Sequence, residues 1–318
     1  MEKEKITIIV PFHSIEAYLE KCLTSIQNQT YKNFEVIMLA NNVHDGSIGI
    51  AKKFANADDR FVLKKYPFPG KNIAKIRNYA LSFASGEYVS WVDGDDYVSP
   101  NFLKVQYEAI KDNNADLSIC RHWPTKSRDH KFSKKTKCKT IVMTNTDGQI
   151  GILTRAFING STTNKMYRTS LLKTIPLNEK CTMFEDLEYN FRYLSNCSKI
   201  VYNKKYLYAV YHRPDSLSRE PNKLQLLRRL TTMNEVVKQD QVTSYALFAR
   251  GLHIAIVTPL LKKCKASHLD LQYKILFARY LKEARDSFKN IKLPFYKKLY
   301  VWIYYMKYKK YLKKNFLF

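Results

Sequence analysis

The stretch VSWVDGDDYVSP, residues 89–100, places three carboxylates directly behind an apolar run. Asp93, Asp95 and Asp96 fall within four residues, so their charges repel one another unless a cation lies between them. Hard divalent cations such as Mg²⁺ and Mn²⁺ prefer oxygen ligands, and one or two carboxylates suffice when phosphate oxygens complete the shell. An acidic turn is the alternative, because Asp and Gly favour turns. The stretch therefore predicts either a site for a metal and a diphosphate or a solvated turn.

Short apolar runs alternate with helical patterns on either side of this stretch. Four runs have the apolar, β-branched character of buried strands: ITIIVPF (6–12), FEVIMLA (34–40), FVLKKY (61–66) and EYVSWVD (87–93). Apolar residues recur at helical spacing between them, and one such pattern covers residues 72–84 and stops at Gly86. The alternation predicts a mainly parallel sheet covered by helices on both faces. Because ligands of such sheets bind at the carboxyl ends of the strands, we expect loops 11–14, 41–47 and 93–97 to form a site.

The pattern changes after residue 120. RHWPTKSRDHKFSKKTKCKT, residues 121–140, is basic and polar, which is typical of a loop or an edge hairpin rather than a core strand. From around residue 222 onward, the chain is predicted to be helical. The sequence therefore predicts an α/β part followed by a helical extension.

The chain of 318 residues is strongly basic, with 54 Lys and Arg against 28 Asp and Glu and a formal net charge of +26. Such a surface attracts polyanions, whether nucleic acid, anionic lipid or sugar nucleotides. The six cysteines are scattered without a CxxC pair, and the first residues lack the apolar core of a signal peptide, which favours free thiols in a reducing cytoplasm. No uninterrupted apolar segment approaches the roughly 20 residues that cross a bilayer. We therefore expect a cytoplasmic protein that is soluble or peripheral.

Several motifs, taken in order, resemble an inverting glycosyltransferase of family 2 with the GT-A fold. The strong matches are ITIIVPF, YLEKCLTSIQNQTYKNFEVIML, the DGS loop, IRNYALSFASGEYV and VDGDDYVSP, and the weaker ones are NKMYRTSLL, FEDLEYNF and YHRPDSLS. The resemblance covers residues 5–220. It implies a Rossmann-like, mixed and mainly parallel sheet flanked by helices.

The same resemblance implies a domain organisation. Residues 1–220 are expected to be the GT-A catalytic domain, with a nucleotide-sugar-binding half over 1–100 and an acceptor half over 101–220. Residues 221–318 are expected to be a helical C-terminal region rich in basic and aromatic side chains.

The resemblance also assigns a donor site. The expected nucleotide- and donor-binding residues are Pro11, His13, Asn41, Asn42, Arg77, Asp93, Asp95, Lys165, Arg213 and Ser216. The expected ligands of Mn²⁺ or Mg²⁺ are Asp95, Asp96 and His212. His13 stands where the family more often has an aromatic residue, and Asn41 and Asn42 stand where an Asp reads uracil; an Asn amide also bonds uracil, because it carries a donor and an acceptor. Structural roles are the alternatives for two of these residues: Arg77 could be a helix residue that pairs with a carboxylate, and His212 an ordinary surface or core histidine.

The segment FEDLEYNF supplies the second half of the chemistry. Inverting transfer needs a carboxylate to take the proton of the acceptor hydroxyl and a metal to neutralise the leaving group. By resemblance, Asp186 is the general base and Glu185 supports the acceptor site. Alternatively, these acids decorate a helix N-terminus, where they suit the macrodipole.

These features together predict a metal-dependent inverting glycosyltransferase. Its donor is expected to be a UDP-sugar, and its acceptor a glycan or lipid-linked glycan hydroxyl in bacterial surface polysaccharide such as capsule, lipooligosaccharide or teichoic acid. A nucleotidyltransferase that releases pyrophosphate is the alternative enzyme. A non-enzymatic nucleic-acid-binding protein is the alternative of another class, but the acidic cluster would repel phosphate, so no nucleic-acid partner is expected.

The C-terminal residues 287–318 contain nine lysines, many aromatic residues and no acidic residue. Aromatic rings settle at the headgroup level of a bilayer while lysines meet anionic lipid. Stacking on nucleic-acid bases, an ordinary solvated helix and an oligomer contact are the alternatives. For a transferase that builds surface glycan, the segment predicts peripheral attachment to the inner face of the cell membrane.

Overall fold

The structure is a computed structural model. It describes residues 4–70, 72–127, 131–133, 139–154, 158–181 and 184–213, and in the C-terminal part residues 232, 236, 246–251, 271–292, 295, 298–299, 302–303 and 305–306. The chain divides into two compact units. The first consists of Met1–Gly148 and Ser161–Asp215, and the second of Gln149–Gly160 and Ser216–Phe318. The predicted boundary at residue 220 stays a prediction.

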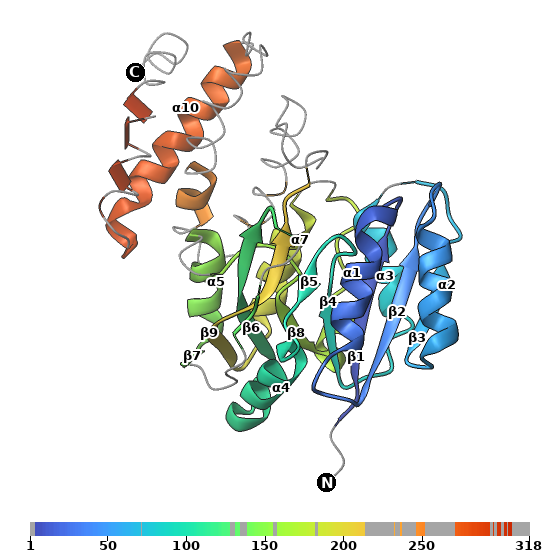
Figure 1. The fold of residues 1–318 in the computed structure, drawn as a ribbon. Coiled ribbons are helices and arrows are strands. Elements are labelled where there is room, and N and C mark those ends of the chain that lie inside the picture. The colour runs from blue at the N-terminus through green and yellow to red at the C-terminus, as the bar shows by residue number, and fades with distance from the viewer. Residues whose placement is uncertain are drawn as a thin grey trace. The chain divides into compact units, whose positions relative to one another are not determined.

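A single mixed sheet organises the first unit (Figure 1). Its strands are β1 (Ile6–Phe12), β2 (Phe34–Ala40), β3 (Phe61–Lys65), β4 (Tyr88–Trp91), β5 (Tyr97–Val98), β6 (Leu117–Thr125), β7 (Thr140–Met143), β8 (Lys165–Arg168) and β9 (Ile200–Tyr211). Among the described residues the strand order is β3-β2-β1-β4-β8-β6-β9-β5, and β7 also pairs with β9. The four predicted strands are therefore confirmed as β1 to β4.

The direction of the strands determines which loops meet. Strands β3, β2, β1 and β4 are all parallel, whereas β8 lies antiparallel between β4 and β6, and β9 runs parallel to β6. Two antiparallel steps restore the original direction, so β6 and β9 point the same way as β1 and β4. Their carboxyl ends consequently share one edge of the sheet, where ligands of such folds bind.

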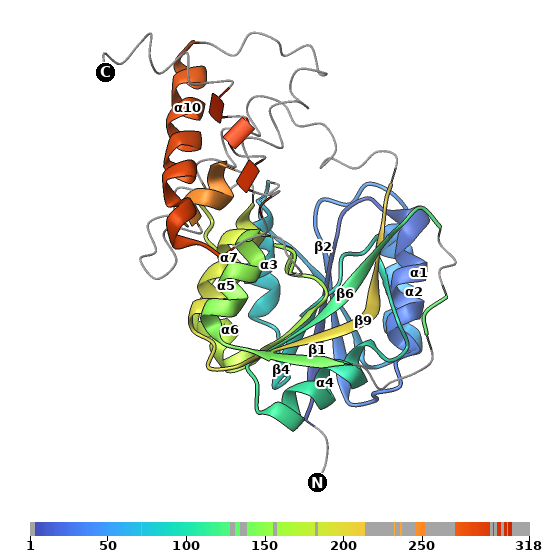
Figure 2. The same ribbon diagram turned by 90° about the vertical axis from the view of Figure 1, so that its left-hand side faces the viewer.

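Helices cover both faces of this sheet (Figure 2). On one face lie α1 (Glu16–Gln27), α2 (Ser47–Ala57) and α4 (Phe102–Asn113), whose apolar residues pack in one cluster with β1 and β2. On the other face lie α3 (Ile73–Leu81), α6 (Thr169–Thr174) and α7 (Glu185–Ser195). Strand β1 is buried along nearly its whole length, because both of its faces are covered. The α/β class with helices on both faces is thus confirmed.

Two local predictions need correction. Helix α3 ends at Leu81 and not at residue 84, because the Ser82 hydroxyl bonds the Tyr79 carbonyl and the next residues form turns. Gly86 instead allows a close backbone approach, since a Cβ there would lie 2.6 Å from the Thr7 nitrogen. RHWPT (121–125), predicted to be a loop or an edge hairpin, is not a loop: it forms the second half of β6 and pairs with β9, which supplies its backbone partners.

Most of the described residues of the second unit are helical. They include α10 (Leu271–Asp286), the 3₁₀ turn η3 (Ser287–Asn290) and a helical stretch at 246–251; α5 (Asn145–Thr154) starts in the first unit and ends in the second. Phe248, Phe277 and Leu281 are fully buried and form the apolar core of this unit. None of the helices that the structure describes is both long and apolar enough to cross a membrane.

Candidate active site

The acidic loop follows β4 at its carboxyl end. Gly94, between the first two aspartates, packs so closely against Ile15 that a Cβ would lie 2.5 Å from its Cδ1 atom. The same Cβ would lie 3.2 Å from the Cβ of Phe12. A side chain at position 94 would have to displace the end of the Ile15 side chain and press on Phe12, so glycine suits the close packing of this loop.

Asp96 anchors the loop to β9. Its Oδ2 accepts a hydrogen bond of 2.8 Å from the Tyr208 hydroxyl, and its Oδ1 accepts one of 2.8 Å from the Tyr211 backbone nitrogen. The Tyr208 oxygen in turn accepts from the Asp93 nitrogen at 3.1 Å. Burial and the neighbouring aspartates raise the pKa of Asp96 well above its usual range. Both carboxylate oxygens of Asp96 thus have protein partners that hold the loop in place.

Asp95 and the end of β9 also meet. Arg213 forms an ion pair with Asp95, with 2.9 Å between its Nε and Oδ2. The neighbouring His212 is exposed, and its backbone nitrogen bonds the carbonyl of Thr125 at the end of β6. Ser216, the remaining predicted donor residue of this segment, lies outside the described residues.

The four residues predicted to line the nucleoside come from neighbouring strands. Pro11 lies in β1 opposite Leu39 of β2, and His13 and Asn41 follow the two strands. The ring Nδ1 of His13 donates to the Asn41 carbonyl at 2.8 Å. Asn42 has a left-handed backbone with φ of 47°, which Asn tolerates better than most residues. The structure therefore brings these residues together, while their contact with a nucleoside stays a prediction.

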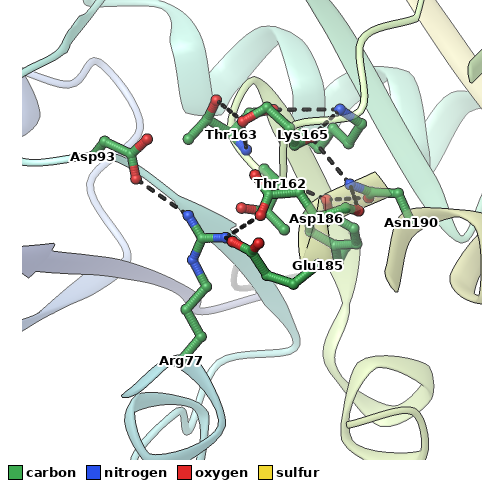
Figure 3. A network of polar contacts seen from close by, with 10 residues as sticks. Arg77, Asp93, Thr162, Thr163, Lys165, Glu185, Asp186 and Asn190 are labelled. Atoms are coloured by element: carbon green, nitrogen blue, oxygen red, sulfur yellow. Dashed lines mark hydrogen bonds and ion pairs between the residues drawn. The ribbon is translucent and has the colours of Figure 1, made fainter. Parts of the chain in front are cut away.

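Arg77 contacts both Asp93 of the acidic loop and Asp186, the predicted base (Figure 3). Its Nη1 lies 2.8 Å from Oδ1 of Asp186 and 3.9 Å from Oε1 of Glu185. Its Nη2 lies 3.5 Å from Oδ1 of Asp93. Arg77 is only 5% exposed, whereas 24% of the Asp186 side chain and 39% of the Asp93 side chain reach solvent. Its pairing with carboxylates is thus observed, and a contact with the donor stays a prediction.

The electrostatics of the carboxylates differ although they share one arginine. Burial acts to raise the pKa of Asp186, yet the charge of Arg77 and a hydrogen bond from Glu185 outweigh it and hold that pKa below its usual value. Burial and the charge of Asp186 raise the pKa of Glu185 to about 8. At neutral pH, Glu185 is therefore protonated and donates a hydrogen bond to an ionised Asp186. One carboxylate is thus available to accept a proton and its neighbour is not.

Asp93 differs from both. Burial raises its pKa to about 6 against the opposing charge of Arg77, while 39% of its side chain still reaches solvent. Water therefore moderates the cost of ionising Asp93, and the group remains accessible from the edge of the sheet.

Hydrogen bonds from Asn190 and Tyr167 fix the first turn of α7. Phe184, just before the helix, has a left-handed backbone with φ of 61°, which is uncommon for an aromatic residue and typical of functional sites. Asn190 donates to the carbonyl of Asp186 at 2.8 Å and to that of Ser161 at 3.1 Å. The Tyr167 hydroxyl donates to Oδ1 of Asn190 at 2.7 Å. These bonds fix the backbone of Asp186 relative to Tyr167 of β8 and to Ser161 before that strand.

Lys165 lies at the start of β8 and is fully buried. Its Nζ donates to the Ser161 carbonyl at 2.5 Å and to Oδ1 of Asn164 at 3.2 Å. Burial lowers its pKa to about 7, although the negative charge of Asp186 opposes that shift. The charge of this lysine, which lies near Asp186, therefore changes around neutral pH. It was predicted for the donor pocket, and that role stays a prediction.

Sequence reasoning missed the supporting residues. Asn190 follows Asp186 by four residues, so helical spacing alone would have placed the two on one face. Tyr167 and Tyr208 gave no such signal, because their partners are distant in the chain: Tyr167 meets Asn190 of α7, and Tyr208 meets Asp96 of the acidic loop. The residues that sequence reasoning missed are supporting ones, which bond the backbone of Asp186 or the carboxylate of Asp96. The residues that it predicted are the carboxylates themselves.

The sheet and its edge define a GT-A-type fold. A crystal structure of TarS from Staphylococcus aureus superposes with a TM-score of 0.63 at 21% identity, covering 89% of this chain and 80% of that one. A mannosyltransferase from Pyrobaculum calidifontis has a TM-score of 0.55 at 13% identity, covering 96% and 88%. The sequence comparison identifies the family, which a shared fold alone does not. The model of glycosyl transferase family 2 matches residues 7–175, and the chain belongs to that family, as its motifs predicted.

Curated relatives agree with this assignment. Glycosyltransferase GlyA of Streptococcus pneumoniae is 29% identical over 233 residues, and the putative glycosyltransferase EpsH of Bacillus subtilis is 28% identical over 216 residues. These matches cover 68% and 65% of this chain, but only 32% of GlyA and 61% of EpsH. The chain therefore spans a part of these relatives.

Proposed function

We propose that this protein is a metal-dependent inverting glycosyltransferase that moves a sugar from a UDP-sugar to a glycan hydroxyl. The observation that carries the proposal is the Arg77 network. It joins Asp93 of the acidic loop to Asp186, a carboxylate kept ionised at 2.8 Å from the guanidinium. A donor-binding loop and a proton acceptor on opposite sides of one buried arginine match the two requirements of inverting transfer.

The chain's own residues account for the proton. The acceptor oxygen forms a bond to the anomeric carbon while the bond from that carbon to the diphosphate breaks, and the hydroxyl proton passes to Asp186. Arg77 keeps Asp186 ionised beforehand, and the proton on Glu185 prevents a second negative charge beside it. Nη1 of Arg77 holds the carboxylate of Asp186 at 2.8 Å, and Asn190 holds the backbone carbonyl of the same residue.

The residues present fit a divalent cation that shares its ligands with phosphate. Asp95 and Asp93 offer carboxylate oxygens, and 26% and 39% of their side chains reach solvent. Within the part of the chain that the structure describes, no group of three or more His, Cys, Asp and Glu forms a closed cage. Mg²⁺ and Mn²⁺ commonly use one or two carboxylates and take the rest from substrate. When bound, such an ion neutralises charge on the leaving diphosphate. Asp96 and His212 stay predictions as further ligands.

The names of similar proteins support a particular substrate class. TarS is a poly(ribitol-phosphate) beta-N-acetylglucosaminyltransferase, 27% identical over 220 residues, and one of its crystal structures contains UDP-GlcNAc. The Pyrobaculum calidifontis mannosyltransferase was crystallised with GDP-Man and Mn²⁺. We infer a UDP-sugar donor and an acceptor in bacterial surface glycan, such as a teichoic acid chain.

A thermal-shift screen tests the donor assignment. Nucleotides and sugar nucleotides are added with and without Mn²⁺, because a ligand that binds only the native state raises the melting temperature. We expect UDP or UDP-sugars to stabilise the protein only when Mn²⁺ is present. Stabilisation by a nucleotide with another base would mean that Asn41 or Asn42 has changed the preference for uracil. If no nucleoside diphosphate shifts the melting temperature, the glycosyltransferase proposal fails.

We also propose that the second unit attaches to an anionic membrane surface at the cytoplasmic face. Five exposed apolar side chains recur at helical spacing there: Phe295, Leu299, Trp302, Ile303 and Met306. The described residues from 295 to 306 are helical, and Tyr305 is buried. An apolar face beside many lysines suits the interface of a bilayer. The final residues of the predicted tail, 307–318, lie outside the described residues.

Vesicle sedimentation tests this attachment. We expect the protein to sediment with phosphatidylcholine vesicles only when they contain phosphatidylglycerol, and Trp302→Glu with Ile303→Glu to abolish binding. Phe68→Glu is the matched control, because Phe68 is 60% exposed but lies in the first unit. Unchanged binding of the double variant would contradict the proposal.

A further inference from the structure

Two exposed aromatic side chains lie edge to face on the sheet of the first unit. Trp123 of β6 is 41% exposed and Tyr206 of β9 is 38% exposed. Their ring centroids are 5.1 Å apart at an angle of 83°. The guanidinium of Arg121 lies 5.3 Å from the Tyr206 centroid, which is cation–π geometry. We call Arg121, Trp123 and Tyr206 the aromatic platform.

An irregularity in strand pairing builds this platform. Cys120 pairs with Asn203, but the next residue, Arg121, pairs with Tyr206, so β9 carries two extra residues at this point. Bulges of this kind re-aim side chains and are common beside active sites. The Tyr202 hydroxyl accepts a hydrogen bond of 3.3 Å from Nε of Arg121 and fixes its direction.

The register of the strands relates the platform to the base. Ile119 pairs with both Lys165 and Tyr202, so these three side chains lie on one face of the sheet. Lys165 and Asn190 both donate to the Ser161 carbonyl, and Asn190 also bonds the backbone carbonyl of Asp186. Arg121 lies two residues farther along β6, which corresponds to about 7 Å toward the carboxyl edge on the same face. The first residue of the platform, Arg121, is therefore the next residue of β6 on this face after Ile119, which pairs with Lys165.

We propose that the aromatic platform binds a sugar ring of the acceptor chain, and that Arg121 binds a negatively charged group on that chain. This inference rests on the proposed function, since it places the acceptor on the side of Asp186. A pyranose ring has an apolar C–H face that packs on Trp or Tyr and a polar rim that stays in water. Exposed aromatic side chains that the core does not need typically mark binding sites.

Arg121 determines the class of glycan. Its planar guanidinium matches carboxylate and phosphate oxygens in a way that a neutral sugar does not exploit. The net charge of +26 favours the approach of an anionic chain over a neutral one. The platform therefore selects an acceptor that combines sugar rings with carboxylate or phosphate groups.

Fluorine NMR of protein labelled with 5-fluorotryptophan tests binding without any need for turnover. The chain has three tryptophans, of which Trp91 is fully buried and Trp302 lies in the second unit, so Trp123 reports on the platform. Three probes are titrated: cellohexaose, hyaluronan hexasaccharide and inorganic tripolyphosphate. We expect both hexasaccharides to move the Trp123 resonance, with about tenfold tighter binding of the charged one, and tripolyphosphate to leave it in place.

Variants separate a sugar platform from general electrostatics. Trp123→Ala and Tyr206→Ala should each weaken binding of hyaluronan hexasaccharide about tenfold, as for aromatic residues central to an interface. Arg121→Gln should remove the preference for the charged probe. Val142→Ala is the matched control, because Val142 is 49% exposed on β7 but pairs with Val201 away from the platform.

The outcomes distinguish this inference from the proposed function. If tripolyphosphate alone reproduces the shift, or if no hexasaccharide moves the Trp123 resonance, the inference is overturned. Metal-dependent stabilisation by UDP is measured on the same samples, and its presence then leaves the proposed function standing. In a transfer assay, Trp123→Ala should raise the acceptor KM about tenfold and leave the donor KM unchanged. A loss confined to the donor KM would also overturn the inference.

Discussion

Nη1 of Arg77 lies 2.8 Å from Oδ1 of Asp186, which places a cation from α3 against the first turn of α7. The two residues are 109 positions apart in the chain. The other arm of the same guanidinium reaches Asp93 at 3.5 Å. One buried arginine therefore lowers the pKa of the proposed base and connects it to Asp93 of the acidic loop.

Arg77→Ala should destabilise the protein and change its pH profile. Removing one partner of a buried ion pair leaves the remaining charges uncompensated, at a cost of about 3 kcal/mol in the free energy of unfolding. The pKa of Asp186 should rise, so the acid limb of the kcat/KM profile should move to higher pH and activity at pH 7 should fall about 100-fold. Urea denaturation and the pH profile measure the two effects. Arg60→Ala, which breaks a half-exposed pair with Asp58, is the control. An unshifted acid limb would contradict the role given to Arg77.

Glu185→Gln should stabilise the protein at alkaline pH. The unfolded chain releases the Glu185 proton near pH 4.5, whereas the folded protein keeps it up to about pH 8. The native state therefore binds more protons between these values, and stability falls as pH rises through them. Glutamine avoids this loss, so the variant should be more stable than the wild type by about 1–2 kcal/mol at pH 8 and equally stable below pH 4. Melting temperatures from pH 4 to pH 9 test this. A difference that does not depend on pH would refute it.

Asp186→Asn and Asp95→Ala should fail in different ways. Asparagine is nearly isosteric but cannot take a proton, so transfer should fall about 1,000-fold while Mn²⁺-dependent binding of UDP persists. Asp95→Ala removes a carboxylate from the acidic loop, so Mn²⁺-dependent binding itself should be lost. Calorimetric titration with UDP, together with initial rates, separates the two. Equal loss of UDP affinity in both variants would defeat this division of roles.

Gly94→Ala should displace the acidic loop. The added Cβ would lie 2.5 Å from Cδ1 of Ile15, which is closer than van der Waals contact allows. We expect a loss of about 2 kcal/mol of stability, as for other overpacked sites, and a raised donor KM. Ile15→Val removes the Cδ1 atom, so the double variant should recover much of both losses. If Ile15→Val does not improve Gly94→Ala, the contact does not position the loop.

The strands β1 to β4 and the acidic loop were predictable because their signals are local. Each strand is an apolar run bounded by turn residues, and the acidic loop follows its strand directly in the chain. The helix start at Glu185 and Asp186 was equally local. RHWPT was predicted to be a loop or an edge hairpin because it is polar, and it is instead part of a strand that pairs with β9. Asp96 was recognised as a member of the cluster, but its bonds to Tyr208 and Tyr211 were not.

The sequence by itself determined the family of this protein, the parallel half of its sheet and the carboxylates that we propose for its chemistry. Each of these depends on residues that are neighbours in the chain. The tertiary structure alone decided that Arg77 faces Asp186, that Tyr208 fastens the acidic loop, and that Trp123 meets Tyr206. These contacts depend on the antiparallel insertion of β8 and on the irregular register of β6 and β9, which bring together residues that lie 80 or more positions apart. The physical reason is that such registers follow from packing across the whole sheet and not from any local pattern.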